Sequence, residues 1–157
     1  SFVYRNIIKE NSVGAWFIDI NNGVVLNNTF FNNSVALRGV NLEVYNNIFY
    51  AEAHTGSLIS IGGSNVIDYN CYFTSIPKRL FNQYGNLKAY SLRTGNGGNS
   101  IFEDPLFENV PGENFALREK SVCIDKGLDK QYKWDAIYKH CGEAVDIGAI
   151  ERCSYEE

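Results

Sequence analysis

Leu26-Asn27-Asn28-Thr29-Phe30-Phe31 is the stretch that decides the fold, because a version of it occurs four times in the first half of the chain. In each version an apolar run ends in an Asn, and a bulky apolar residue follows two positions later. The other three versions are Tyr4-Arg5-Asn6-Ile7-Ile8, Tyr45-Asn46-Asn47-Ile48-Phe49 and Asp68-Tyr69-Asn70-Cys71-Tyr72. The recurring Asn residues are 28−6=22, 47−28=19 and 70−47=23 positions apart. A repeat of this length indicates a solenoid whose units bury their apolar faces by stacking.

Three apolar segments recur at matching distances from the Asn when Asn28, Asn47 and Asn70 are aligned without gaps. They are 16–20 over 35–39 over 58–62, then 24–26 over 43–45 over 66–68, and finally 30–31 over 49–50 over 72–73. Three short strands in each repeat of roughly 21 residues predict an all-β fold, a parallel β-helix with a three-sided cross-section.

Side chains alternate between the two faces of a strand, so this alignment also predicts which residues of the first segment are buried. The expected core residues are Trp16, Ile18, Ile20, Val35, Leu37 and Leu58. The expected outward row is Phe17, Asp19, Ala36, Arg38, Ile59 and Ile61.

An Asn that recurs at one turn of a coil can bond its amide to the equivalent Asn in the neighbouring coils, about 4.8 Å away. The residues expected to form this ladder are Asn6, Asn28, Asn47 and Asn70. The alternative is that Asn is frequent here only because loops favour it. That alternative does not explain why the Asn residues keep a constant distance from the Phe and Tyr positions.

The length of 157 residues fits one domain with a sizeable core. A net charge of −4, with no Lys or Arg cluster, argues against a nucleic-acid or anionic-membrane surface. No apolar run approaches the ~18 residues of a membrane span. The sequence opens inside a repeat and contains no Met, so we expect it to be the C-terminal piece of a longer protein. A complete, capped first coil in the structure would overturn that expectation.

Four cysteines leave several alternatives open. Cys71 and Cys123 lie in apolar surroundings and are expected to pack as small hydrophobic residues. For Cys141 and Cys153 three alternatives stay open: a disulfide, a weak metal site with His140, or two free thiols. The spacing of cysteines alone does not settle their pairing.

The second half of the chain contains four short motifs in a particular order. They are Asp104-Pro105-Leu106-Phe107, Phe115-Ala116-Leu117, Ser121-Val122-Cys123-Ile124-Asp125-Lys126-Gly127 and Asp146-Ile147-Gly148-Ala149-Ile150-Glu151. Together with the repeats, this order resembles right-handed parallel β-helix proteins of the pectate-lyase-like superfamily, in particular the closing segment of bacterial secreted or surface members. The chain departs from that pattern at Val122, Cys123 and Ile150, and in a long insert, 128–144.

The resemblance implies one right-handed β-helix domain with three regions. They are coils with the Asn ladder (1–75), the last irregular coils (76–127), and an end-cap insert with a closing strand (128–157). The apolar spacing of the insert is loosely helical, so a short helix on the end of the solenoid is expected. The resemblance also implies a secreted or cell-surface location, a polysaccharide or oligosaccharide partner, and further coils of the same protein upstream.

In relatives of this superfamily the substrate lies along the face formed here by the outward row. Asp19 and Arg38 have the same offset from their ladder Asn (28−19=9 and 47−38=9), so they are expected to stack on adjacent coils. Glu52 and His54, in the loop before the next strand, are expected to reach the same patch. These residue types suit a glycosidase or a polysaccharide lyase, which needs paired carboxylates or a base with a cation. A surface salt bridge beside a solvated loop is the alternative.

Surface aromatic residues are the candidate sugar platforms, because aromatic rings stack on sugar rings. These residues are Phe17, Tyr45 and Trp134. No metal ligand set is evident, and Ca²⁺ has no supporting motif. The sequence therefore leaves two hypotheses: part of a carbohydrate-active enzyme whose main catalytic coils lie upstream, or a non-catalytic surface or carbohydrate-binding module.

Overall fold

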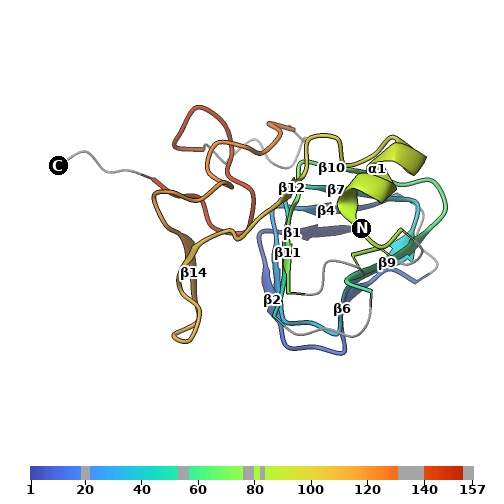
Figure 1. Cartoon of the computed structure of the whole chain (residues 1–157), viewed down its shortest axis with the longest axis horizontal. Coiled ribbons are helices and arrows are strands. Elements are labelled where there is room, and N and C mark those ends of the chain that lie inside the picture. Colours follow the sequence, from blue (N-terminus) through green and yellow to red (C-terminus); the bar gives the residue numbers. More distant parts are fainter. Residues whose placement is uncertain (19–21, 53–56, 76–79, 82–83, 131–139, 154–157) are drawn as a thin grey trace.

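The computed structural model describes residues 1–18, 22–52, 57–75, 80–81, 84–130 and 140–153. Its main body is a parallel β-solenoid of about three turns with three sheets, as the repeats predict (Figure 1). Sheet A contains β1 (Phe2–Tyr4), β4 (Gly23–Leu26), β7 (Leu42–Tyr45) and β10 (Val66–Asp68). Sheet B contains β2 (Ile7–Lys9), β5 (Thr29–Phe31), β8 (Ile48–Ala51), β11 (Cys71–Thr74) and β12 (Ile101–Phe102). Sheet C contains β3 (Val13–Trp16), β6 (Val35–Val40) and β9 (Ile59–Gly62).

The predicted strand register is correct in sheets A and B and wrong in sheet C. In sheets A and B, Val25 lies opposite Val44, and Phe30 lies opposite Phe49. In sheet C, Arg38 lies opposite Trp16 rather than Asp19. The cause is a turn of variable length. Trp16 is paired with Arg38 in sheet C, and Gly23 is paired with Leu42 in sheet A. The connection from sheet C to sheet A therefore spans 23−16=7 positions in the first coil and 42−38=4 in the second.

This shift reverses part of the predicted inside and outside of sheet C. Phe17, Ala36 and Ile59 are buried, although they were expected to point outward. Trp16 and Ile18 are each 56% exposed, although they were expected in the core. Leu37 and Leu58 are buried as expected, Val35 and Ile61 are only partly buried, and Ile20 lies outside the described residues.

Two glycines make the inward position of Phe17 sterically allowed. A Cβ on Gly23 would lie 2.6 Å from the Phe17 ring, and a Cβ on Gly39 would lie 3.0 Å from the Phe17 Cβ. Any larger residue at either position would displace the ring. The small residues therefore set the direction of the side chain here.

The asparagine ladder runs along the turn between sheets A and B. The side-chain oxygen of Asn28 accepts from the backbone N–H and the amide of Asn6, at 2.9 and 3.3 Å. Asn47 accepts from Asn28 in the same way, and Asn70 from Asn47, at 2.9 and 3.0 Å in both cases. Asn11 and Asn33 form a second, shorter ladder between sheets B and C. These bonds satisfy turn backbone groups that would otherwise be buried without partners.

Aromatic side chains stack on both faces of sheet B. Inside the solenoid the ring of Phe49 stacks on Phe30 and Tyr72, with centroids 5.0 and 5.4 Å apart. Outside it Tyr50 stacks on Phe31 and Phe73, at 5.0 and 4.9 Å. An outward aromatic row of this kind must be covered to be stable in water.

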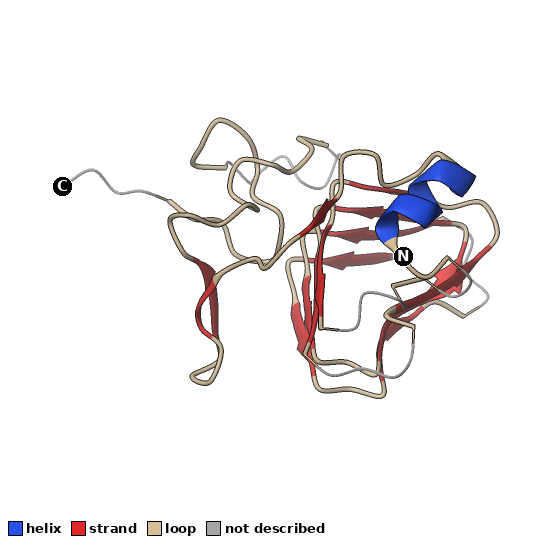
Figure 2. Ribbon diagram, viewed as in Figure 1, coloured by secondary structure: helices blue, strands red, loops and turns tan. Residues whose placement is uncertain are grey.

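The segment after β12 provides that cover, and it lies on the flank of the solenoid rather than on its end (Figure 2). Its antiparallel hairpin, β13 (Phe107–Asn109) and β14 (Asn114–Leu117), places Phe107 and Phe115 against Tyr50 and Phe31. The predicted end cap is therefore wrong in position. The predicted closing strand is also wrong, because residues 146–151 form an irregular segment. The predicted helix of the insert falls largely on 131–139, outside the described residues.

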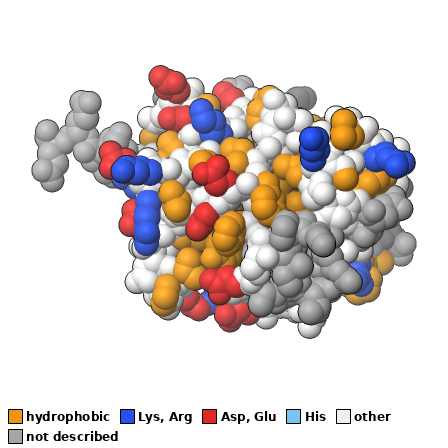
Figure 3. Space-filling model, viewed as in Figure 1, with side chains coloured by type: hydrophobic (Ala, Val, Ile, Leu, Met, Phe, Trp, Pro, Cys, Tyr) orange, Lys and Arg blue, Asp and Glu red, His pale blue; other side chains and the backbone are white. Residues whose placement is uncertain are grey.

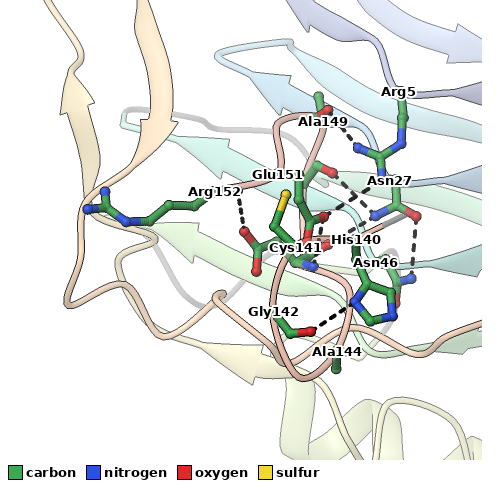
Figure 4. A network of polar contacts seen from close by, with 12 residues as sticks. Arg5, Asn27, Asn46, His140, Cys141, Gly142, Ala144, Ala149, Glu151 and Arg152 are labelled. Atoms are coloured by element: carbon green, nitrogen blue, oxygen red, sulfur yellow. Dashed lines mark hydrogen bonds and ion pairs between the residues drawn. The ribbon is translucent and has the colours of Figure 1, made fainter. Parts of the chain in front are cut away.

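The described residues of 105–130 and 140–153, which we call the flank cap, are bonded to the ladder turn (Figure 4). Asn46 accepts from the backbone N–H of Leu128 and donates to its carbonyl, both at 2.8 Å. The Asn27 amide donates to the Asp146 carbonyl at 3.0 Å, and Arg5 donates to the Ala149 carbonyl at 3.4 Å. Three successive coils thus hold the same cap.

Two further elements complete the chain. Helix α1 (Leu87–Thr94) was not predicted; Asn86 caps its start by accepting from the Ala89 N–H, and Gly95 ends it in a left-handed conformation. In the described part of the chain no helix is long and apolar enough to cross a membrane. Cys141 and Cys153 form a disulfide within the flank cap, and Cys71 and Cys123 are buried free thiols.

Candidate functional site

The outer face of sheet C carries a row of exposed or partly buried side chains, one from each coil. Trp16 of β3, Arg38 of β6 and Ser60 of β9 lie side by side because the three strands are parallel and in register. Ile18 and Val40 follow two positions further along and are also exposed, at 56% and 41%. We call these five residues the sheet C strip.

The centre of the strip is a contact between Trp16 and Arg38. The guanidinium carbon of Arg38 lies 5.2 Å from the centroid of the Trp16 ring, which is a cation–π geometry. The indole is more than half exposed, so it remains open to a ligand. Among the described residues no carboxylate forms an ion pair with Arg38. Guanidinium N–H groups are donors that suit hydroxyl or carboxylate oxygens.

The other predicted catalytic residues are not brought to this row by any described contact. Asp19 and His54 lie outside the described residues. Glu52 directly follows β8. Its backbone N–H donates to the Asn32 side chain at 3.0 Å and its carbonyl accepts from the Ser75 hydroxyl. Whether the four residues act together in catalysis stays a prediction from the sequence.

Glu52 instead forms a small acidic corner with Tyr50. The Tyr50 hydroxyl donates to Glu52 Oε1 at 3.1 Å. Burial, this hydrogen bond and the negative charges of Glu52 and Asp104 raise the pKa of Tyr50 to about 12. The phenol therefore stays protonated at neutral pH and acts only as a donor to Glu52. A cavity of about 210 Å³ lies beside it, between Tyr50, Asp104 and Arg118.

The two predicted aromatic platforms that the structure describes, Phe17 and Tyr45, are not at the surface. Phe17 is 5% exposed and packs in the core. Tyr45 is 8% exposed, because Lys130 of the flank cap lies over its ring, 4.1 Å from the centroid, while pairing with Glu43. Trp134 lies outside the described residues. The prediction that Phe17 and Tyr45 are surface residues is wrong.

Trp16 is an exposed aromatic residue of sheet C that sequence reasoning missed. The signal that could have found it is Gly39, which has no side chain to fill the space inside the coil. The neighbouring strand must therefore supply a large inward side chain beside Gly39, and Phe17 supplies it. Once Phe17 points inward, its neighbours Trp16 and Ile18 must point outward.

A metal site at the cysteines is ruled out by their disulfide, which leaves no free thiolate at Cys141 or Cys153. Elsewhere in the described ranges, no three His, Cys, Asp or Glu side chains are grouped as metal ligands. On the face that Figure 3 shows, acidic and basic side chains are mixed, and hydrophobic ones form a band between them. That mixture is consistent with the low net charge of the sequence.

Comparison of the chain with protein-family models, with curated protein sequences and with solved structures finds no match. The site is therefore interpreted from its own geometry.

Proposed function

We propose that this chain is a polysaccharide-binding β-helix whose binding surface is the sheet C strip. The observation that carries the proposal is the exposed Trp16 ring beside the guanidinium of Arg38 on a parallel sheet. An indole face suits the C–H face of a sugar ring, and guanidinium N–H groups suit its hydroxyl or carboxylate oxygens. The resemblance of the repeats and of the closing motifs to the pectate-lyase-like superfamily supports a carbohydrate ligand.

The shape of the strip favours an extended polymer over a small molecule. Neighbouring coils are about 4.8 Å apart, so Trp16, Arg38 and Ser60 are spaced along a line that an extended chain can follow. Strands β1, β2 and β3 are the outermost of their sheets, and further coils of the same protein would lengthen the strip beyond Trp16. A longer strip would add contacts in proportion to its length.

A secreted or cell-surface location is part of the proposal. The disulfide between Cys141 and Cys153 supports it, because such bonds persist mainly in oxidising compartments. A polysaccharide ligand would be met in the same compartments.

Binding of the chain to a panel of neutral and acidic soluble polysaccharides, measured by affinity electrophoresis and calorimetry, tests the proposal. Trp16→Ala is expected to weaken binding about tenfold or more, because the stacking surface is lost. Arg38→Gln should weaken binding of acidic polymers most, and reduce the dependence of that binding on salt. Leu92→Ala is the matched control, because Leu92 is 79% exposed on α1, away from the strip.

The proposal fails if Trp16→Ala and Leu92→Ala bind every polymer equally well, or if the unaltered chain binds none. The alternative, cleavage by a glycosidase or lyase centre, is tested in the same samples. Release of reducing ends or of unsaturated sugars that stops in Glu52→Gln would favour the enzyme.

A further inference from the structure

The C-terminal end of the solenoid contains a cavity lined by residues other than those of the sheet C strip. In the incomplete fourth coil, Phe81 pairs with Ile59 of β9, and Gly97 donates to the Ile67 carbonyl of β10. Helix α1 fills the space between these two points (Figure 1). Between α1 and the turn of the third coil remains a cavity of about 390 Å³, which we call the end pocket. It is lined by the end of β9 and the turn that follows, by Phe81 and Tyr84, and by α1 and Asn96.

One wall of the end pocket is aromatic. Phe81 and Tyr90 stack on each other with centroids 3.9 Å apart and an interplanar angle of 10°, and both are almost completely buried. Tyr84 meets Tyr90 at 72°, with centroids 5.4 Å apart. Unlike those two, Tyr84 is only partly buried. Its ring is therefore the aromatic surface that a ligand can reach, held in place by the stacked pair behind it.

The opposite wall is polar and held by hydrogen bonds. The Asn65 side chain accepts from the Leu42 N–H at 2.8 Å, and the Asn96 side chain accepts from the Ile67 N–H at 3.0 Å. The Asn96 amide also donates to the Asn65 carbonyl at 3.2 Å. These bonds fix the rim of the pocket before any ligand arrives, which lowers the entropic cost of binding.

The charge of the pocket selects the class of ligand. No described residue that lines it carries a charged side chain. Thr94 is the last residue of α1, so the negative end of the helix dipole faces this region. Among the described lining residues a carboxylate would meet no cationic side chain. The volume lies near the lower end of ligand pockets, about 300–1,000 Å³, and suits a molecule of one or two rings.

We infer that the end pocket binds a neutral pyranoside, with its C–H face on Tyr84 and its hydroxyl groups toward the Ser64 and Asn65 wall. This site deepens the proposed carbohydrate function but rests on different residues. The sheet C strip suits a polymer lying along the coils, whereas an end pocket suits a single sugar unit or the end of a chain. The two sites can therefore be tested separately.

The test is a titration of the ¹⁵N-labelled chain, followed by amide chemical shifts, with methyl glucoside, methyl galactoside and N-acetylglucosamine as neutral probes. Glucuronate and galacturonate are the acidic probes. At least one neutral probe is expected to shift the amides of Ser64, Tyr84 and Asn96 in a saturable way, and the acidic probes to shift them at least about tenfold more weakly. Tyr84→Ala should weaken binding about tenfold, and Tyr84→Phe should retain it within about twofold.

Ser64→Trp serves as a second variant, because Ser64 is exposed in its turn and an indole there fills the pocket mouth without entering the core. It should abolish the shifts at Tyr84 and Asn96 while leaving the unfolding temperature unchanged. Trp16→Ala should leave the titration unaltered. The inference is overturned if no neutral probe shifts these amides, if acidic probes bind as well as neutral ones, or if Ser64→Trp binds like the unaltered chain. If Trp16→Ala loses polymer binding but keeps the sugar titration, the result bears on the sheet C strip and leaves the end pocket unaffected.

Discussion

The side-chain oxygen of Asn47 accepts two hydrogen bonds from Asn28, one from its backbone N–H at 2.9 Å and one from its amide at 3.0 Å. The Asn47 amide in turn donates to the carbonyls of Val25 and Tyr45, and the residue is completely buried. Asn47→Ala leaves these groups without partners and is expected to lower the free energy of unfolding by about 3 kcal/mol or more. Urea unfolding followed by circular dichroism measures this loss.

Asn6 is the matched control for this prediction, because it is a rung of the same ladder at the exposed end. Water replaces its lost bonds, so Asn6→Ala should cost only about 1 kcal/mol or less. Equal losses in the two variants would contradict the idea that burial gives the ladder its stabilising effect.

The stacked ring of Phe49 offers a second measurement. It is completely buried between Phe30 and Tyr72, so Phe49→Ala removes two ring contacts and leaves a cavity. The expected loss in the free energy of unfolding is about 3–5 kcal/mol. Phe102→Ala, at a position 41% exposed in sheet B, is the control and should cost about 1 kcal/mol or less. A smaller loss at Phe49 than at Phe102 would mean that this stack is not part of the cooperative core.

Glu10 occupies a strained backbone position at the turn after β2. Its φ is 56°, a left-handed conformation that costs a residue with a Cβ about 1–2 kcal/mol. Glu10→Gly is therefore expected to raise the free energy of unfolding by up to about 1 kcal/mol, after the entropic cost of glycine. Glu10→Ala keeps the Cβ and should bring no such gain. If both variants are equally stable, the turn is not strained at this residue.

Two buried carboxyl groups of the flank cap predict a pH dependence. Burial raises the pKa of Asp146 and, together with the charge of Asp146, raises the pKa of Glu151. Hydrogen bonds from backbone N–H groups and the cation of Arg5 oppose the shifts without cancelling them. Because both pKa values are higher in the folded chain than in the unfolded one, the folded state binds protons more tightly. Their contribution to stability is fully present below their unfolded pKa values and is lost as pH rises through the folded ones.

Thermal unfolding between about pH 4 and pH 7 measures this effect. These groups should lower the unfolding temperature as pH rises, and Glu151→Gln should make the dependence shallower because one titrating group is removed. Glu119→Gln is the control, since Glu119 is exposed. A steeper dependence in Glu151→Gln than in the control would contradict the assignment.

The disulfide between Cys141 and Cys153 closes a short loop in the flank cap. Its removal in the double variant Cys141→Ser, Cys153→Ser is expected to destabilise the cap by about 2–3 kcal/mol, chiefly by freeing the unfolded loop. Hydrogen exchange should then increase around Asp146 and Gly148, while the ladder amides at Asn28 and Asn47 stay protected. Increased exchange at the ladder as well would show that cap and solenoid unfold together.

The solenoid itself could be predicted from the sequence because the Asn and aromatic positions share one spacing. Sheets A and B follow directly from that spacing, since they flank the ladder turn on either side. Sheet C was misaligned because the turn between it and sheet A varies in length. Alignment on Asn11 and Asn33, the second ladder, would have placed Trp16 opposite Arg38. The error moved Asp19 into the place that Trp16 occupies, and so changed the composition of the candidate site.

The position of the flank cap could be predicted in part from the sequence. Adjacent aromatic residues such as Phe30-Phe31 place bulky rings on both faces of one strand, which indicates that both faces are covered. The partner that covers the outer face could not be identified, because its contacts are with an irregular segment that has no periodic pattern. Helix α1 carries ordinary start and stop signals at Asn86 and Gly95, which the search for repeats overlooked.

The ladder also gives the molecule a direction. The side-chain oxygens of Asn28, Asn47 and Asn70 each accept from the Asn of the preceding coil, so at every step the amide nitrogen donates to the following coil. The amides are thus a column of aligned dipoles running the length of the solenoid. A coil copied from 28–46 and inserted in the same orientation would continue that column with one more rung, whereas a reversed coil would place oxygen against oxygen. The length of this protein can therefore change by whole coils while both of its ends stay as they are.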